Sequence, residues 1–496
     1  MERRLLVLAA SAFIVAAVLS SAWITGQFTT PAVDRTDGYV SELAARNQPW
    51  TRLFRVSEVL SGLSCVFGVA LVPRVAREWP GWLALAAFGL LTFAAGLFPL
   101  DCAALSDPAC GRAGTSFAHR MHTLAGPLGT VAVLAAMVVL SLRWRSWVSW
   151  LFTWLSLAAT LLTVAAHADR HGVGIAHRAQ LTLIAVWLVY VAVHLLISDD
   201  DDHDHHQAAW DEPAITVNGT TGAGTWNSVA GGADGYGRPH VVEQGAGPAV
   251  LITAGPGGAW FHWDRVAGHL AGGRRRVIRF DRPGLGLSPR SPAPPTLYAE
   301  VARLAGLSPA HPERVTVLAH GVACWHAEAF ARLHPLCVAG LVLVDPACAV
   351  RRRRLALGGS AGQWLPALGG TWGATALARL AGPAAHRLLT GEPDPSGAYS
   401  LGKVPLAVAG EWLARRDMAA DLRLLRGEKP LPGVPVIVVS TGARDPCRQR
   451  LATMLGARLV RLPVSRRQVH LKAPEAIAEM VSAIPARGPG PSHRNP

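Results

Sequence analysis

The chain begins with six apolar segments, each long enough to cross a lipid bilayer as a helix. A helical span needs about 20 predominantly apolar residues, and Trp and Arg are typical of its ends. The segments lie at 5–24, 56–72, 82–100, 121–142, 147–166 and 179–197, and each is bounded by Arg, Pro or Trp. The pattern therefore predicts an all-α six-span transmembrane domain over residues 1–197.

Arginine gathers on one side of these spans. It occurs in the two shortest loops and at the N-terminus, at Arg3, Arg4, Arg74, Arg77, Arg143 and Arg145. Loops rich in Arg stay in the cytoplasm, and an even number of spans returns the chain to its starting side. We therefore expect a multi-pass protein of the cell (inner or plasma) membrane with both termini in the cytoplasm. The apolar share of 50% and the mean hydropathy of +0.27 agree with a membrane location.

From residue 240 the pattern changes to short β-branched runs that alternate with helical periodicity, which predicts a parallel sheet with helices on its faces. The predicted strands are 249–254, 276–281, 315–319, 340–344, 434–440 and 458–462. The predicted helices are 260–272, 296–306, 322–334 and 474–484. Residues 348–432 interrupt the alternation with helical sequence, and we interpret this insertion as a lid.

The α/β domain thus spans residues 240–485. Residues 198–239, an acidic run followed by a Gly-rich stretch, are interpreted as a flexible linker. Residues 486–496 are interpreted as a disordered tail.

One stretch of this domain, Arg314 to Pro335, has the form of a strand, a tight turn and a helix. This is the context of a nucleophile elbow, in which G-x-S-x-G places a serine at the turn. The corresponding residues are Ala319-His320-Gly321-Val322-Ala323, so the small flanking residues are present and the central serine is replaced by Gly321.

Together with this elbow, five further motifs in order make residues 240–485 resemble the α/β-hydrolase superfamily. They are AGPGGAW (254–260), FDRPGLGLS (280–288), LVLVDPA (341–347), TGARDP (441–446) and HLKAPEAIAEMV (470–481). The resemblance implies an oxyanion pocket around Gly257, Gly258 and Val322 and a catalytic acid at Asp445. It also places the nucleophile at Gly321 and the base at Arg467, because the His470-Leu471 and Pro474-Glu475 pairs fix the register.

Only the acid of a catalytic triad therefore remains. Serine activation needs a base within hydrogen-bond reach and an acid that orients the base. One rescue is that His470 takes the place of the base and activates water, with Asp445 orienting it. The other is that Cys324 or His320 supplies the chemistry, although Cys324 reads better as a buried structural residue.

The six-span domain carries its own candidate site. Asp and His side chains gather at span ends on the side opposite the cytoplasm, at Asp101, His119, His122, His167 and His171. His and Asp side chains are ligands for a divalent metal such as zinc, and a zinc with an open position can activate water. The alternative is that these residues are simply solvated. Cys102 and Cys110 lie in the same outer region, where a disulfide is chemically possible.

The hydrophobic pattern, the FPLDC segment and the following HRMH make residues 1–197 resemble a bacterial six-span family of unknown function. The resemblance implies an integral membrane protein without an assigned activity. More distantly, the His and Asp arrangement resembles the multispan metal-dependent lipid hydrolases that include alkaline ceramidases.

The net charge of +14 comes almost wholly from Arg. Because no basic stretch is interleaved with stacking aromatics, we expect no nucleic-acid partner.

Two functions follow from the sequence. The first is a catalytically degenerate α/β-hydrolase-like module that binds an apolar or lipid-like ligand, or regulates, beside a bilayer-embedded domain. The alternative is an active hydrolase of ester or lipid substrates, acting through either half.

Overall fold

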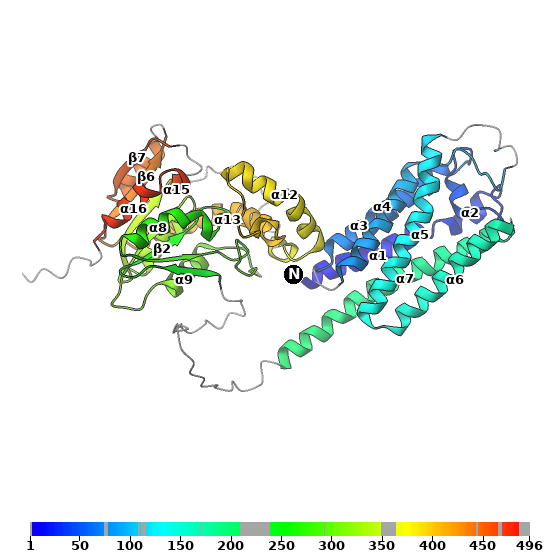
Figure 1. The fold of residues 1–496 in the computed structure, drawn as a ribbon, viewed down its shortest axis with the longest axis horizontal. Helices are drawn as coiled ribbons and strands as arrows, with labels where there is room; N and C mark the ends of the chain where they lie inside the picture. The colour runs from blue at the N-terminus through cyan, green and yellow to red at the C-terminus, as the bar shows by residue number, and fades with distance from the viewer. Residues whose placement is uncertain are drawn as a thin grey trace, which may run out of the picture. The chain divides into compact units, whose positions relative to one another are not determined.

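The computed structural model describes residues 2–73, 78–107, 110, 116–169, 171–208, 239–291, 293–348, 364–442, 445–464 and 469–485. These residues form two compact units, a helical unit followed by an α/β unit, and each is described here by itself (Figure 1). The predicted fold class is confirmed by both units.

The helical unit contains six helices that are long and apolar enough to cross a membrane. Its elements are α1 (Glu2–Ser20), α2 (Trp23–Thr29), η1 (Val40–Ala44), α3 (Thr51–Leu71), α4 (Trp79–Leu97), α5 (Phe117–Trp144), α6 (Trp147–Asp169) and α7 (Val173–Ala208). Each long helix packs on the next along the chain, and α7 returns to contact α1, so the bundle closes on itself.

Glycines bring two of these helices into close contact. A Cβ added to Gly62 of α3 would lie 2.4 Å from the carbonyl oxygen of Gly89 in α4. Small residues at such crossings let helix backbones approach each other in a membrane, where lipid and side chain are equally apolar. A side chain at position 62 would therefore push α3 and α4 apart.

The boundary after the last span differs from the prediction. Residues 198–208 were assigned to the flexible linker, but α7 continues through them to Ala208. Extending a helix that has already formed adds a hydrogen bond for each residue fixed, so a polar segment can prolong an apolar helix. The rest of the predicted linker, up to residue 238, and the predicted tail at 486–496 lie outside the described residues.

The α/β unit is built on a seven-stranded sheet in the order β1-β3-β2-β4-β5-β6-β7. The strands are β1 (Val241–Gln244), β2 (Ala249–Thr253), β3 (Arg276–Phe280), β4 (Val315–His320), β5 (Val338–Val344), β6 (Val436–Thr441) and β7 (Arg458–Leu462). All neighbouring strands are parallel except β1, which pairs antiparallel with β3 and was not predicted. The carboxyl ends of β2, β4, β5 and β6 therefore meet at one edge, the position at which such sheets bind ligands.

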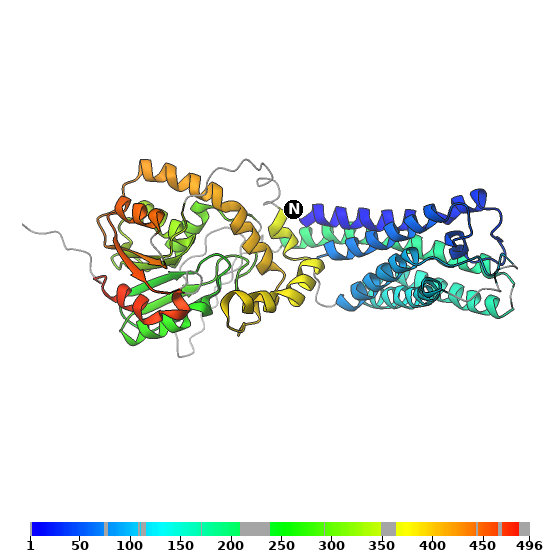
Figure 2. The same cartoon turned by 90° about the horizontal axis from the view of Figure 1, so that it is seen from above.

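Helices cover both faces of the sheet, as continuous apolar strands require. On one face the core is completed by α8 (Asp264–Gly272), α15 (Val469–Lys472) and α16 (Pro474–Ser482), next to η3 (Trp260–Trp263). On the other face it is completed by α9 (Leu297–Leu307), α10 (Ala323–Leu333), α13 (Lys403–Glu428) and α14 (Pro446–Met454). In Figure 2, red α16 and orange α13 lie on opposite sides of the strands.

The insertion between β5 and β6 is helical where it is described. It contains α12 (Trp372–Thr390), η4 (Ala398–Ser400) and α13. β5 and β6 nevertheless pair directly, from Leu341 with Val436 to Val344 with Val439, so the insertion leaves the sheet unbroken. It leaves β5 at the edge of the sheet that carries the elbow and rejoins the sheet at the opposite edge, where β6 begins.

Candidate functional site

The elbow has the predicted form of a strand, a turn and a helix. β4 ends at His320, Gly321 has a φ of +62°, and α10 begins at Ala323. The Gly321 N–H donates to the Val344 carbonyl at 3.0 Å, and its carbonyl accepts from the Ala347 N–H at 3.0 Å. The turn is therefore anchored to the end of β5, but its central residue carries no side chain.

A proline faces the elbow from the loop after β2. A Cβ added to Gly321 would lie 3.1 Å from Cδ of Pro256. In this type of site, the loop contributes a backbone N–H that stabilises the oxyanion together with the N–H after the nucleophile. Because proline has no N–H, the loop residue nearest to Gly321 cannot donate that bond.

The two glycines after Pro256 use their N–H groups within the protein. The Gly257 N–H donates to Oε2 of Glu411 at 3.1 Å, and the Gly258 N–H donates to the Gly255 carbonyl at 2.9 Å. The Gly257 carbonyl accepts from the Tyr399 hydroxyl at 2.5 Å. The predicted pocket residues Gly257, Gly258 and Val322 thus lie on the loop and the elbow as expected, but the glycine donors are already occupied.

Arg282 fixes the same loop from the turn after β3. It donates to the carbonyls of Ala254 and Gly255, the latter at 2.8 Å, and its Nε donates to Oε1 of Glu411 at 2.6 Å. The Arg282 side chain is almost fully buried and that of Glu411 largely so. A buried charge needs a partner, so Arg282 and Glu411 depend on each other.

The base position, Arg467, lies outside the described residues. His470 lies in α15, 8% exposed, with its ring stacked on Trp263 at 4.7 Å and 5.2 Å from the ring of His320. Its Nδ1 has no hydrogen-bond partner among the described residues. Burial holds the pKa of His470 well below its usual value, and His320 and His262 lower it further. His470 is therefore neutral at pH 7 and a weak proton acceptor.

A second histidine pair lies beside His470 and joins the lid to the core. The Ala259 N–H donates to Nδ1 of His262 at 3.1 Å, so neutral His262 carries its proton on Nε2. That Nε2 lies 2.9 Å from Nε2 of His386 in α12, which must then accept. His386 consequently carries its proton on Nδ1. Burial lowers the pKa of His262 to about 4, with the neighbouring His386 contributing, so the pair is neutral at pH 7.

Asp445 is the N-cap residue of α14. Its Oδ1 accepts from the Cys447 N–H at 3.0 Å, and its Oδ2 lies 3.7 Å from Arg448, which is 3.0 Å from Asp345 at the end of β5. The structure also joins Cys348 and Cys447 in a disulfide. Asp445 is thus a helix cap within a cross-linked turn, as well as the residue at the predicted acid position.

Two cavities lie near these elements. The one beside Val322 has a volume of about 10 Å³, room for one water, and is lined in part by Arg282, Glu411 and His326. A larger cavity of about 250 Å³ lies between α10, α13 and α14. Its lining is mostly apolar with three arginines at its border: Trp325, Ala347, Cys348, Ala419, Leu422, Arg423, Arg426, Cys447, Arg450, Leu451 and Met454.

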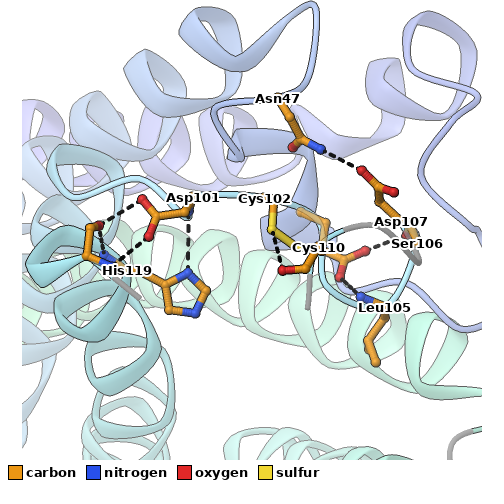
Figure 3. Close-up of a disulfide and its surroundings, with 10 residues drawn as sticks. Asn47, Asp101, Cys102, Leu105, Ser106, Asp107, Cys110 and His119 are labelled. Carbon is orange, nitrogen blue, oxygen red and sulfur yellow. Dashed lines mark hydrogen bonds between the residues drawn. A yellow bond between two sulfur atoms is a disulfide. The ribbon is translucent and has the colours of Figure 1, made fainter. Parts of the chain in front are cut away.

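In the helical unit, two of the predicted metal ligands, Asp101 and His119, lie to one side of the Cys102–Cys110 disulfide (Figure 3). The Asp101 carboxylate accepts from Ser116 at 2.7 and 2.8 Å, which holds the pKa of Asp101 below its usual value. The Asp101 N–H donates to Nδ1 of His119 at 3.3 Å, so that nitrogen is engaged. His122 uses its Nδ1 to donate to the carbonyls of Ala95 and Phe98, at 2.9 and 3.0 Å, which leaves its Nε2 without a proton.

The other predicted ligands lie on α6 and in the turn after it. His167 Nδ1 is 3.2 Å from the Tyr39 hydroxyl, and His171 is 3.8 Å from Asp37. In the part of the chain that the structure describes, the one group of three metal-type ligands within 4.8 Å of each other is Cys348, Asp445 and Cys447. The predicted zinc site in the membrane half stays a prediction.

Comparison with known proteins assigns a family description to each half. Residues 13–194 match the model "Protein of unknown function (DUF998)", and residues 249–480 match "Alpha/beta hydrolase family". Both predicted resemblances are thereby confirmed. No curated protein gave a significant match.

Solved structures similar to the second half are α/β hydrolases. The thioesterase domain from the curacin biosynthetic pathway is 17% identical, with a TM-score of 0.39 over 49% of this chain and 94% of that one. The enol-lactonase from Burkholderia xenovorans LB400 is 21% identical, with a TM-score of 0.38 over 50% and 95%. A putative epoxide hydrolase from Pseudomonas aeruginosa is 18% identical, with a TM-score of 0.38 over 49% and 90%.

Proposed function

We propose that the α/β half is a catalytically degenerate hydrolase-fold module that binds a ligand or regulates the membrane half, and that it performs no acyl transfer. The proposal is supported chiefly by the catalytic edge of the sheet. There Gly321 stands at the nucleophile position, Pro256 faces it without an N–H, and the next donor, Gly257, binds Glu411. An acyl-enzyme route needs the nucleophile and the oxyanion donors together, so these features act against the same reaction.

The lid contacts support a regulated module. Glu411 and Tyr399, both from the insertion, bind the two backbone polar groups of Gly257, its N–H and its carbonyl. A ligand that reached the elbow would have to displace both. Binding would then be coupled to lid position, because a ligand shifts a conformational equilibrium by its differential affinity for the two states.

The volume and lining of the larger cavity indicate the chemical class of the proposed ligand. Its volume of about 250 Å³ and mostly apolar lining suit a small apolar or lipid-like molecule. Arg423 and Arg450 make only hydrogen bonds to carbonyls of their own helices in the described structure, so an anionic end on the ligand would find partners. We therefore propose an amphipathic ligand whose apolar part occupies the cavity.

We further propose that the protein lies in the cell membrane with both termini in the cytoplasm. Support comes from the arginines in the short loops and from the even number of candidate spans. The α/β half would then lie in the cytoplasm.

The test is ester hydrolysis by the full chain in lipid nanodiscs, with p-nitrophenyl butyrate as substrate and a fluorophosphonate probe for an activated serine. We expect no turnover and no labelling of the native chain. Gly321→Ser/Arg467→His should restore the nucleophile and the base that the resemblance requires. If the fluorophosphonate labels this double variant, the fold still supports the reaction and the native chain lacks only the two side chains. The proposal would be overturned if the native chain hydrolyses the ester and if Asp445→Ala or His470→Ala abolishes this turnover.

The alternative function, an active hydrolase, is separated by the same assay. If His470 activates water, the native chain should hydrolyse the ester although the fluorophosphonate does not label it. Chemistry in the membrane half would instead be abolished by a chelator and by His119→Ala, and left intact by His470→Ala. His122 favours this second route, because its Nδ1 binds carbonyls and its Nε2 is left as a free ligand atom.

A further inference from the structure

Helix α12 of the lid exposes leucines to an unusual extent. Leu377 is 63% exposed, Leu380 84%, Leu388 87% and Leu389 59%. Single exposed leucines are common on soluble proteins, but a contiguous group on one helix marks an interaction site. The exposed group therefore needs a partner outside the α/β unit.

The leucines form a stripe on the side of α12 that faces away from the core. At 100° per residue, Leu377, Leu380 and Leu388 fall within about 80° of each other, with exposed Ala384 between them. The residues that α12 buries, Thr375, Ala378 and His386, fall on the opposite side. The helix thus has one face that the described residues cover and one leucine-rich face that they leave exposed.

The charge and composition of α12 indicate what covers its exposed leucine face. The sequence of α12, WGATALARLAGPAAHRLLT, contains no acidic residue, and its only full charges are the exposed Arg379 and Arg387. At 100° per residue, Arg387 falls about 20° from Leu380 at the border of the stripe, whereas Arg379 falls on the side of His386. A helix with Leu on one side and Arg at the border is typical of segments that lie in the surface of an anionic bilayer. The same chain carries six candidate spans, so that bilayer is held close by covalent connection.

We propose that the Leu377, Leu380 and Leu388 stripe of α12 lies in the surface of an anionic phospholipid bilayer, with Arg387 at the phosphate groups. The inner face of the same helix carries His386, which binds His262 of the core at 2.9 Å. Bilayer contact would therefore act directly on the part of the lid that closes the candidate site.

The experiment measures how deep the stripe lies, using the full chain in nanodiscs of equal parts phosphatidylglycerol and phosphatidylcholine. A nitroxide is attached at Leu388→Cys in a Cys337→Ser background, because the other two free cysteines, Cys65 and Cys324, are buried. Collision of the label with oxygen, which concentrates in lipid, is compared with collision with a water-soluble nickel complex. Leu424→Cys is the matched control, since Leu424 is a similarly exposed leucine, at 66%, on α13.

We expect oxygen collisions to dominate at position 388 and nickel collisions to dominate at position 424. A label at Leu377→Cys should likewise report lipid, and Leu380→Glu/Leu388→Glu should return that label to water. Nickel access at 388 as high as at 424 would show a solvated stripe and overturn the proposal. Low access for both reagents would also overturn it, because a second copy or another protein would then cover the stripe.

Discussion

Glu411 accepts a hydrogen bond from the Gly257 N–H at 3.1 Å while its other carboxylate oxygen binds Arg282 at 2.6 Å. One side chain of the lid therefore satisfies both a backbone donor beside the elbow and a buried cation beneath it. In an active oxyanion site the backbone donors must be free to meet developing negative charge. Here the Glu411 carboxylate already accepts the Gly257 N–H bond. This bond stabilises the loop and the lid together, and it leaves that N–H unable to stabilise an oxyanion.

Removing this carboxylate should destabilise the α/β half. Glu411→Ala removes the carboxylate that is hydrogen-bonded to buried Arg282, and breaking one side of a buried ion pair costs about 3 kcal/mol or more. Glu411→Gln should lose nearly as much, because its amide oxygen keeps the Gly257 bond but not the charge. The measurement is urea unfolding of the full chain in nanodiscs, followed by pulse proteolysis of the α/β half.

Asp417→Ala is the control for that series, since Asp417 is an exposed acid on the same helix. It should change the free energy of unfolding by no more than about 0.5 kcal/mol. Equal effects of the substitutions at 411 and 417 would mean that the ion pair with Arg282 contributes nothing.

A serine at position 321 should be tolerated at a measurable cost. Gly321 has a φ of +62°, and a residue with a Cβ pays about 1–2 kcal/mol in that left-handed region. The new Cβ would also lie 3.1 Å from Cδ of Pro256, so the loop must give slightly. Gly321→Ser and Gly321→Ala should therefore lower the free energy of unfolding by similar amounts.

Gly268→Ser is the matched control for the elbow. Gly268 lies in α8, and a Cβ there meets nothing within 4 Å. It should show no loss, because serine has a higher helix propensity than glycine. An unchanged stability in Gly321→Ser would show that the elbow is not strained by a side chain.

The sequence predicts most of this fold because its signals are local. Six apolar stretches and six β-branched runs correspond to the six candidate spans and to β2 through β7. β1 was missed because Val241–Gln244 is four residues long and only partly buried, which leaves no continuous apolar run. The continuation of α7 to Ala208 was not predicted, because the acidic composition of this segment does not favour a helix.

The site was predicted only as far as its motifs extend. Gly321, Asp445 and the loop glycines follow from strand-and-turn patterns, but Glu411 and Tyr399 lie about 150 residues further along the chain and carry no local signal. The pairing of His262 with His386 is equally non-local. Pro256 could have been found, since a proline in the oxyanion loop removes an N–H by its chemistry alone.

Replacing His326 should reduce the sensitivity of the α/β half to acid. The His326 ring is buried beside Arg282 and Glu411, and neither of its nitrogens has a hydrogen-bond partner among the described residues. Burial, with Arg282 nearby, lowers the pKa of His326 to about 3, below the value of about 6.5 in an unfolded chain. The folded form thus loses stability as the pH falls from about 6.5 towards 3, because the unfolded chain takes up a proton first.

His326→Leu removes this contribution. The free energy of unfolding should depend on pH less steeply by about 1.4 kcal/mol per pH unit between pH 6 and 4. At pH 8 the variant should be at least as stable as the native chain, since an unpartnered buried polar ring is itself costly. Urea unfolding at pH 8, 6 and 4 makes the comparison, and parallel curves for the two proteins would contradict it.

The two disulfides should not coexist in a cell. Cys102–Cys110 lies between α4 and α5 and Cys348–Cys447 lies in the α/β half, so three candidate spans separate them along the chain. An odd number of crossings places them on opposite sides of the membrane, and only one side is oxidising. With both termini in the cytoplasm, Cys348 and Cys447 should be alkylated in acid-quenched cells without reductant, and Cys102 and Cys110 only after reduction. The opposite pattern would reverse the orientation, and protection of both pairs would contradict the six-span topology.

Purification in air should then close the second disulfide and stabilise the α/β half. Cys348 and Cys447 are 99 residues apart, and closing a loop of that length is worth about 4.7 kcal/mol in the chain-entropy treatment. Urea unfolding with and without a thiol reductant measures the difference, with Cys348→Ser as a variant that should not respond. Because the same cross-link lies beside Asp445, assays of the candidate site should be run on the reduced protein, which is the state that this orientation predicts in the cell.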